Sequence, residues 1–264
     1  MSGAFCHIAG VGLLGPGLPG WAASIPVLSG AAPWVPAETV LPPPPLLPPT
    51  ERRRAGAVTR LALAAATEAS AGLDAAALDT VFASSNGDGA TLGAILEALT
   101  AEGSDVSPTQ FHNSVHNAAA GYWGIGTHSM RPSVSLGGHD DVLPLGLLQA
   151  AAQCAAWGRP VLFCAYDAPL PPPLDACHPA AFPFAMALVL RPGREGGLAG
   201  LRLWHQAEDC AAPATRGALG EALEDGNPVA RALPMLEALA AGRPADLCWP
   251  LLDGGAVCAA LSPC

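Results

Sequence analysis

The sequence predicts an α/β fold in which helices pack on a central sheet. Short apolar runs rich in β-branched and aromatic residues alternate with longer runs rich in alanine and leucine, and this alternation is typical of sheets covered by helices. Of the 264 residues 51% are hydrophobic and only 13% are charged. The chain therefore has ample material for a core and is not a disordered segment.

The apolar runs define the expected elements. Seven short runs bounded by turn residues predict strands, at Phe5–Val11, Thr80–Ala83, Ser133–Leu136, Val161–Ala165, Ala185–Leu190, Leu201–Trp204 and Ala256–Leu261. Five longer runs predict helices, at Ala57–Ala71, Thr91–Thr100, Ser114–Gly126, Val142–Trp157 and Val229–Ala241. Glycines at 72 and 158 follow two of these helices, as C-terminal caps do. Two proline-rich stretches, Leu41–Pro49 and Pro169–Pro173, predict extended surface loops, with an SH3-type ligand as the alternative for the first.

Charge and cysteine usage exclude several classes of protein. The formal net charge is −10, with twelve basic against 22 acidic residues and no lysine, which argues against nucleic acid and anionic membranes as partners. The longest apolar stretch, Val142–Trp157, is interrupted by polar residues and is too short to span a bilayer. The N-terminus lacks the features of a signal peptide, and the eight cysteines form no C-x-x-C pair. We expect free thiols in a reduced, cytoplasmic protein.

Two short motifs have weak chemical content. The stretch Gly10–Gly15 matches the G-x-G-x-x-G pattern after a strand, but the prolines and glycines of residues 16–20 prevent a helix from starting behind it. We therefore interpret it as a strand and turn, and expect no cofactor.

His112 and His116 would share a helix face as two zinc ligands do, and His139, Asp140 and Asp141 could join them. The glutamate of H-E-x-x-H is missing, since Asn113 is there instead. Capping, surface or interface roles are favoured, and no metal is expected.

The segment from Ser107 to Gly126 is the most distinctive part of the chain. Pro108 and polar residues lead into a helix, the small residues 118–121 allow close packing, and Tyr122 and Trp123 follow. Periodicity alone indicates a core helix with an aromatic anchor. No G-x-S-x-G motif occurs, so an α/β-hydrolase nucleophile has no support.

With its neighbours, this segment resembles the N-terminal half of the β-ketoacyl synthases, which have the thiolase fold. The matching pieces run through the chain in the order of the family: Phe82–Gly89, Ser107-Pro108, Phe111, Ser114–Asn117, Ala120-Gly121, Pro132–Ser135 and Gly158–Ala165. The resemblance covers residues 2–205. It implies a truncated thiolase-like fold with a layered α/β/α arrangement, in one domain over residues 1–264, of which residues 206–264 form a C-terminal extension with a helix and a strand.

The departures from the family bear on activity. The position of the nucleophilic cysteine falls on Asp140, and the two histidine motifs of the family are absent. The chemistry needs a thiolate at a helix N-terminus, and a carboxylate is a far poorer acyl acceptor. Only about seventy residues follow Leu190, too few for the second half of the fold. A half-fold is expected to leave sheet surface for a partner.

The combination resembles the short chain-length-factor-like proteins of aryl polyene or xanthomonadin-type pigment clusters. It implies a non-catalytic protein that pairs with a ketosynthase as a heterodimer or heterotetramer and meets the acyl carrier protein indirectly. The strand of residues 133–136 is expected to pair across the pseudo-twofold axis. The implied interface or tunnel residues are Gln110, Phe111, His112, Asn113, Tyr122, Trp123, Ser133, Val134, Ser135 and Leu136. The alternative for Phe111 and Trp123 is that they fill this chain's own core.

A different class of function is also open. His139 with Asp140 or Asp141 would suit a general-base pair in a repurposed enzyme acting on acyl-ACP, a decarboxylase or a thioesterase-like protein. A third possibility is a homodimeric acyl-binding scaffold without a ketosynthase partner.

Overall fold

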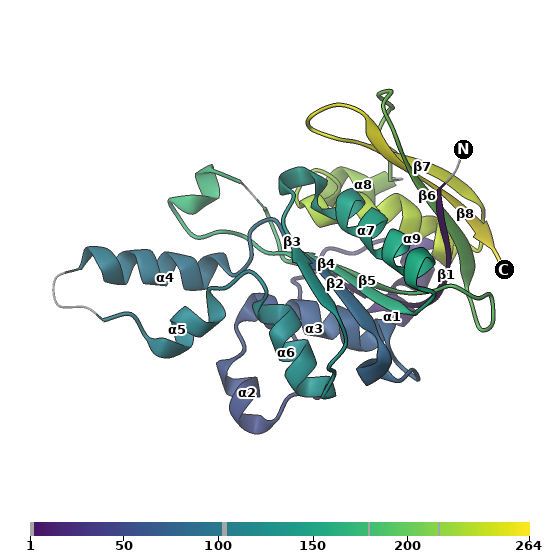
Figure 1. Cartoon of the computed structure of the whole chain (residues 1–264). Coiled ribbons are helices and arrows are strands. Elements are labelled where there is room, and N and C mark those ends of the chain that lie inside the picture. The colour runs from purple at the N-terminus through teal and green to yellow at the C-terminus, as the bar shows by residue number, and fades with distance from the viewer. Residues whose placement is uncertain (1–2, 102–104, 179, 216) are drawn as a thin grey trace.

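The protein is built around one mixed sheet of eight strands (Figure 1). The computed structural model describes residues 3–101, 105–178, 180–215 and 217–264. The strands lie in the order β3-β2-β4-β5-β1-β6-β8-β7. Their bounds are β1 (Ala4–Leu14), β2 (Asp79–Ala83), β3 (Ser133–Leu136), β4 (Val161–Asp167), β5 (Phe184–Arg191), β6 (Ala199–Gln206), β7 (Ala245–Pro250) and β8 (Ala256–Pro263). Strands β3, β2 and β4 are parallel, and all other pairs are antiparallel.

Helices cover both faces of the sheet over its first half, which confirms the predicted α/β fold. The helices are α1 (Trp21–Leu28), α2 (Pro49–Arg54), α3 (Ala57–Ala69), α4 (Gly89–Thr100), α5 (Pro108–Asn113), α6 (Ala118–Thr127), α7 (Val142–Trp157), α8 (Gly217–Leu223) and α9 (Leu233–Ala240). Helices α3 and α6 enclose one core with one face of the sheet, and α7 and α9 enclose the other. Every residue of β2 and β4 is buried, so here the chain covers both faces of its sheet without a partner.

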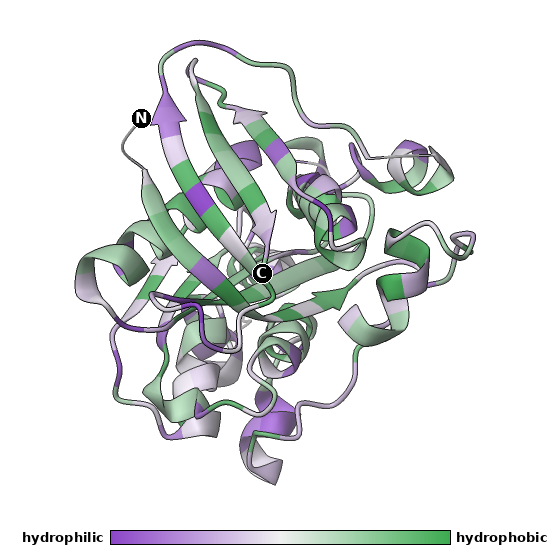
Figure 2. Ribbon diagram, turned by 90° about the vertical axis from the view of Figure 1, so that its right-hand side faces the viewer, coloured by the Kyte–Doolittle hydropathy of each residue, from purple (hydrophilic) through white to green (hydrophobic). Residues whose placement is uncertain are grey.

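The sheet is open only in its second half. Along β6 and β7, buried leucine and tryptophan side chains alternate with exposed or half-buried residues such as Arg202 and Asp246. This alternation is typical of strands with one solvated face. In Figure 2 the outer strands stand in front of the helices, with no helix over the face that they turn to the viewer. The expectation of uncovered sheet surface therefore holds for these strands and not for the central ones.

Two predicted helices are shorter than expected. The helix predicted for 114–126 begins only at Ala118, as α6, and residues 114–117 separate it from α5, which ends at Asn113. The hydroxyl of Ser114 donates to the carbonyl of Phe111 at 2.9 Å, a local bond that competes with helix propagation. The run 229–241 consists of a 3-10 turn, residues 228–232, followed by α9. Strand β7 and helices α1, α2, α5 and α8 were not among the predicted elements.

The glycines of the G-x-G-x-x-G match serve packing. A Cβ atom at Gly10 would lie 1.9 Å from the carbonyl oxygen of Ala69, and one at Gly12 would lie 1.9 Å from that of Ala65. Both carbonyls belong to α3, so the two glycines let this helix lie directly on β1. The strand continues through the motif to Leu14, which leaves no helix N-terminus behind the glycines.

The proline-rich loops are also packed against helices. In the first loop Leu47 is buried, and Leu46 occupies the space where Gly126 of α6 has no side chain. This loop ends at Pro49, where α2 begins. In the second loop Leu170 contacts Gly89 at the start of α4. Both segments therefore fix the positions of helices.

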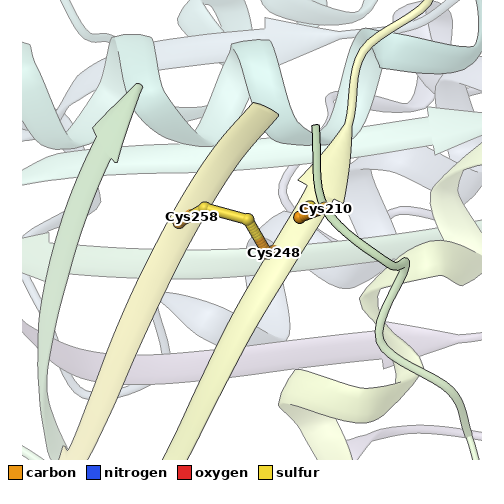
Figure 3. A group of neighbouring side chains, drawn as sticks. All are labelled: Cys210, Cys248 and Cys258. Atoms are coloured by element: carbon orange, nitrogen blue, oxygen red, sulfur yellow. A yellow bond between two sulfur atoms is a disulfide. The ribbon is translucent and has the colours of Figure 1, made fainter. Parts of the chain in front are cut away.

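The expectation of eight free thiols is wrong for one pair. Cys248 of β7 and Cys258 of β8 lie directly opposite each other and form a disulfide, and Cys210 lies beside them (Figure 3). The three sulfur atoms lie within 4.8 Å of one another. Sequence spacing could not reveal this pair, because the register of β7 on β8 brings the two residues together. No helix in the described part of the chain is long and apolar enough to cross a membrane.

Candidate functional site

The candidate site lies where the three parallel strands end. Loops leave β2, β3 and β4 at the same edge of the sheet, and the carboxyl ends of parallel strands are the usual place for a site in α/β folds. The loop after β2 begins at Ser84, the loop after β3 begins at Gly137, and the loop after β4 contains His178. The second of these loops leads directly into α7.

Asp167, the last residue of β4, holds the first loop in place. Its fully buried carboxylate accepts hydrogen bonds from the Ser84 hydroxyl at 2.8 Å and from the backbone N–H groups of Ser85 and Asn86 at 3.0 and 2.9 Å. Burial raises the pKa of the Asp167 carboxyl, and these hydrogen bonds oppose the rise. The loop is thus pre-organised by a buried acid that sequence analysis did not select.

A cluster of two histidines and one aspartate forms at the start of α7. His178 Nε2 lies 2.8 Å from Asp140 Oδ1, and His139 Nδ1 lies 3.4 Å from Asp140 Oδ2. The two imidazole rings stand edge to face, with centroids 4.1 Å apart. The other nitrogen of His178, Nδ1, lies 2.8 Å from Asn86 Oδ1. This cluster takes the place at which the resemblance puts a nucleophile.

Asp141 binds a different set of polar groups from those of this cluster. Its buried carboxylate lies 3.5 Å from the Arg231 guanidinium and accepts the backbone N–H of Leu252 at 2.9 Å. Arg231 also donates to the carbonyl of Asp140 at 2.6 Å. A cavity of about 560 Å³ is lined by both aspartates and by Trp249, among others. Of the predicted general-base pairs, the structure therefore brings together only His139 and Asp140.

His112 and His116, which would share a face on a continuous helix, lie apart in the structure. His112 lies on α5, where its ring stands edge-on to Tyr122. His116 lies between α5 and α6, and its Nε2 atom is 2.8 Å from the carbonyl oxygen of Ser84. The break between the two helices separates the residues, so they share no helix face.

The predicted interface residues fall into two groups. Tyr122 and Trp123 are buried within this chain, at 1% and 2% exposure, and belong to the core between α3, α6 and the sheet. Asn113 is also buried, because its side chain donates to the Arg54 carbonyl at 2.7 Å and accepts the Tyr122 hydroxyl at 3.0 Å. These residues hold α2, α5 and α6 together and do not face outward.

The remaining residues of the set are accessible. Phe111 is 67% exposed, which excludes a place in the chain's own core, and Gln110 and His112 flank it on the same short helix. Strand β3 is the edge of the sheet and pairs only with β2, so Ser133, Val134, Ser135 and Leu136 have one free side. A cavity of about 430 Å³ runs beside this edge, lined by Gly121, Trp123, Arg131, Ser133 and Ser135 among others.

The residues that sequence analysis missed come from irregular loops. His178 follows a proline-rich stretch with no periodic pattern, and Asn86 lies in a glycine-containing turn. The one available signal was topological. Asp167 and the polar residues after Ala83 follow neighbouring buried strands, so their meeting at one sheet edge could have been expected.

Comparison with known proteins places the chain in a family. The model of the β-ketoacyl synthase N-terminal domain matches residues 29–243. The chain belongs to the β-ketoacyl synthase family. A search of curated proteins finds no significant match. The predicted resemblance to the N-terminal half of a ketosynthase is therefore confirmed.

Solved structures share this ketosynthase fold. A structure of a ketosynthase, ApeO, in complex with its chain length factor, ApeC, from Xenorhabdus doucetiae has a chain that is 22% identical, with a TM-score of 0.71 over 97% of this chain and 98% of that one. The ishigamide ketosynthase/chain length factor gives 16% identity and a TM-score of 0.70, over 98% and 99% of the two chains. A ketosynthase from module 6 of the bacillaene synthase of Bacillus subtilis 168 is 13% identical, with a TM-score of 0.55 over 82% of this chain but only 44% of its own.

Proposed function

We propose that this chain is a non-catalytic chain length factor, which pairs with a ketosynthase and shapes the acyl tunnel in the biosynthesis of an aryl polyene. The observation that carries the proposal is Asp140 at the entrance to α7, where the resemblance puts the nucleophilic cysteine of the family. Acyl transfer needs a thiolate at this point. The nearest cysteine along the helix, Cys154, is buried, and burial raises the pKa of its thiol to about 11. It is therefore inert as a nucleophile.

The edge strand β3 has free backbone groups with which a partner subunit could pair. The backbone N–H of Thr80 bonds to the Pro132 carbonyl and that of Ser84 to the Leu136 carbonyl. With a period of two along the strand, the peptide groups of residues 132, 134 and 136 face β2, and those of Ser133 and Ser135 face outward. A short edge strand with free hydrogen-bonding groups is a template for a strand of another subunit.

An apolar arm lies next to this edge. Helices α4 and α5 project from the body of the protein, as Figure 1 shows. They and the segment after them expose large hydrophobic side chains, namely Leu92, Leu96, Leu99, Phe111 and Val115. Clustered exposed apolar side chains mark interaction surfaces. We propose that the arm reaches over the ketosynthase, with Phe111 directed toward the partner's acyl tunnel.

The cavity beside β3 is a candidate for the closed end of that tunnel. It adjoins the proposed interface, and the Trp123 ring forms part of its wall. The small residues Ala120 and Gly121 leave it unfilled, so larger side chains there would shorten the available space. The ketosynthase–chain length factor complexes with the same fold support the pairing of this chain with a ketosynthase.

Co-expression with a candidate ketosynthase partner from the same genome tests the proposal. We expect one stable complex containing both chains, and polyenes that become shorter when Gly121 is replaced by leucine. Phe111→Asp should weaken the complex, whereas Phe5→Asp, at an exposed phenylalanine on β1 far from β3 in the sheet order, should not. A stable monomer whose deletion leaves polyene length unchanged would refute the proposal.

The second candidate is an enzyme acting on acyl-ACP. The specific observation in its favour is the 2.8 Å contact between His178 and Asp140, which resembles a general base and its orienting acid. Replacing His139 and Asp140 together by alanine separates the two functions. Loss of product with an intact complex would favour the enzyme, and unchanged polyene production would favour the chain length factor.

A further inference from the structure

We propose that His139, Asp140 and His178 bind a zinc ion. The three residues come from two loops, one before α7 and one after β4, and offer two imidazole nitrogens and a carboxylate. Their ligating atoms lie within 4.8 Å of one another. Two histidines and one carboxylate are a known zinc ligand set, which leaves a fourth position for water. The proposal stands independently of the ketosynthase partner.

The distances fit a tetrahedral ion after a small movement. With zinc–ligand bonds of about 2.0–2.2 Å, two ligands of a tetrahedral site lie about 3.3 Å apart. The observed separations are 2.8 Å between His178 Nε2 and Asp140 Oδ1 and 3.4 Å between His139 Nδ1 and Asp140 Oδ2. They end on different oxygens, so a small rotation of the Asp140 carboxylate is needed to offer one oxygen to the ion. The third separation, between the histidines, is at most 4.8 Å. His139 is the most exposed of the three side chains, at 56%, and can close that gap.

The surroundings of His178 favour a cation at its Nε2 atom. Its Nδ1 atom lies 2.8 Å from the amide oxygen of Asn86. In the tautomer with the proton on Nδ1, that nitrogen donates to Asn86, and Nε2 is free to bind a metal. The Nε2 lone pair is then directed at the carboxylate oxygen of Asp140, 2.8 Å away. A zinc ion bound to both atoms would satisfy the two lone pairs of that tautomer. A histidine whose second nitrogen donates to an amide or carbonyl oxygen is the usual arrangement around zinc.

The two other ligands are also held in position. The Ser85 hydroxyl donates to the carbonyl of His139, and His139 has a φ of 49°, a conformation that non-glycine residues rarely adopt. Arg231 donates to the carbonyl of Asp140. Its positive charge is offset by the Asp141 carboxylate at 3.5 Å, so it does not oppose a cation at the cluster. A bound ion would tie the loop after β4 to the start of α7.

Zinc titration of the full chain tests the proposal. The protein is treated with a chelator, freed of it and titrated without reductant, so that Cys248 and Cys258 stay bonded to each other. All variants carry Cys210→Ser in addition, so that the free thiol beside the disulfide cannot bind zinc. We expect one zinc per chain, and a melting temperature raised by roughly 5–10 °C at a hundredfold excess of zinc over the dissociation constant. Magnesium, which prefers oxygen ligands, should have no such effect.

Matched variants locate the ion. His178→Gln, Asp140→Asn and the more conservative His139→Gln should each weaken zinc binding at least tenfold, whereas His205→Gln, at an exposed histidine on β6, should not. Cobalt substituted for zinc should give visible ligand-field bands without a sulfur charge-transfer band. Circular dichroism of each variant checks that it is folded. A chain that binds no zinc, or binds it equally well in a folded His139→Gln variant, would overturn the assignment.

Discussion

Replacing Ser135 by proline tests whether β3 pairs with a partner. The N–H group of Ser135 faces away from β2, so proline removes no hydrogen bond from the sheet of this chain, and edge strands accept proline. The extended residue before it, Val134, already has the conformation that proline requires of its predecessor. We therefore expect the chain alone to lose about 1 kcal/mol of stability or less.

The loss should appear in the complex. Each hydrogen bond across a strand pair contributes about 0.5–1.5 kcal/mol, and a carbonyl left buried without its donor costs about 1–3 kcal/mol more. Together they predict a loss of about 2–4 kcal/mol, or roughly 30- to 1000-fold in the dissociation constant for the ketosynthase.

Two control variants and two measurements make the result interpretable. Titration of labelled ketosynthase gives the dissociation constant, and thermal unfolding of the chain alone gives its stability. Ser135→Ala keeps the N–H group and should bind like the unmodified chain. Val134→Pro removes a bond to β2 and should lower the stability of the chain itself. A folded Ser135→Pro variant that binds the ketosynthase with unchanged affinity would show that β3 does not pair.

Three further predictions concern the chain alone. Asp167→Asn should cost about 1–3 kcal/mol, because an acceptor of backbone N–H groups is lost. Since burial raises the pKa of Asp167, the folded chain binds this proton more tightly than the unfolded chain does. Urea unfolding should therefore show this cost growing as pH falls through the raised pKa toward 3.8, and a pH-independent cost would contradict the argument. Gly12→Ala should destabilise by several kcal/mol through its clash with α3, whereas Gly121→Ala, with no atom within 4 Å of the new Cβ, should stabilise α6 by up to about 1 kcal/mol in thermal unfolding; equal effects would refute the packing assignment. Brief alkylation followed by mass spectrometry should label the exposed thiols Cys177 and Cys264 first, and labelling at equal rates would contradict the burial of the other group, Cys6, Cys154 and Cys164.

The sequence predicted those elements whose patterns are local. The run 142–157 is bounded by two aspartates and a glycine, and the helix has those bounds. The helix predicted for 114–126 begins too early, because residues 114–117, among them Ser114 and Asn117, form a turn before α6. Strand β7 was not predicted because it is short and contains Asp246 and Pro250, two residue types that are uncommon in strands.

The candidate site was predictable only in part. His139 and Asp140 precede a helix in the sequence, so their position followed from the helix itself. His178 could not be selected, because only the tertiary structure brings the loop after β4 to that helix. The predicted interface residues divide into a buried group and an exposed group. The sequence pattern of α5 and α6 does not reveal which residues belong to which group. Phe111 and Trp123 look alike in the sequence, yet one is exposed and the other enclosed.

The two edge strands of the sheet, β7 and β3, differ in how easily a strand of another chain can pair with them. At the β7 edge, Pro250 lacks an N–H group, Asp246 is exposed, and the disulfide holds the strand to β8, so an incoming strand meets charge and a missing donor. At the β3 edge, nothing in the described structure blocks addition. We therefore expect strand addition at the β3 edge and not at the β7 edge, and expect a chain produced without a partner to associate with itself through β3. For this reason the isolated chain should be handled dilute, or made together with the subunit that completes its sheet.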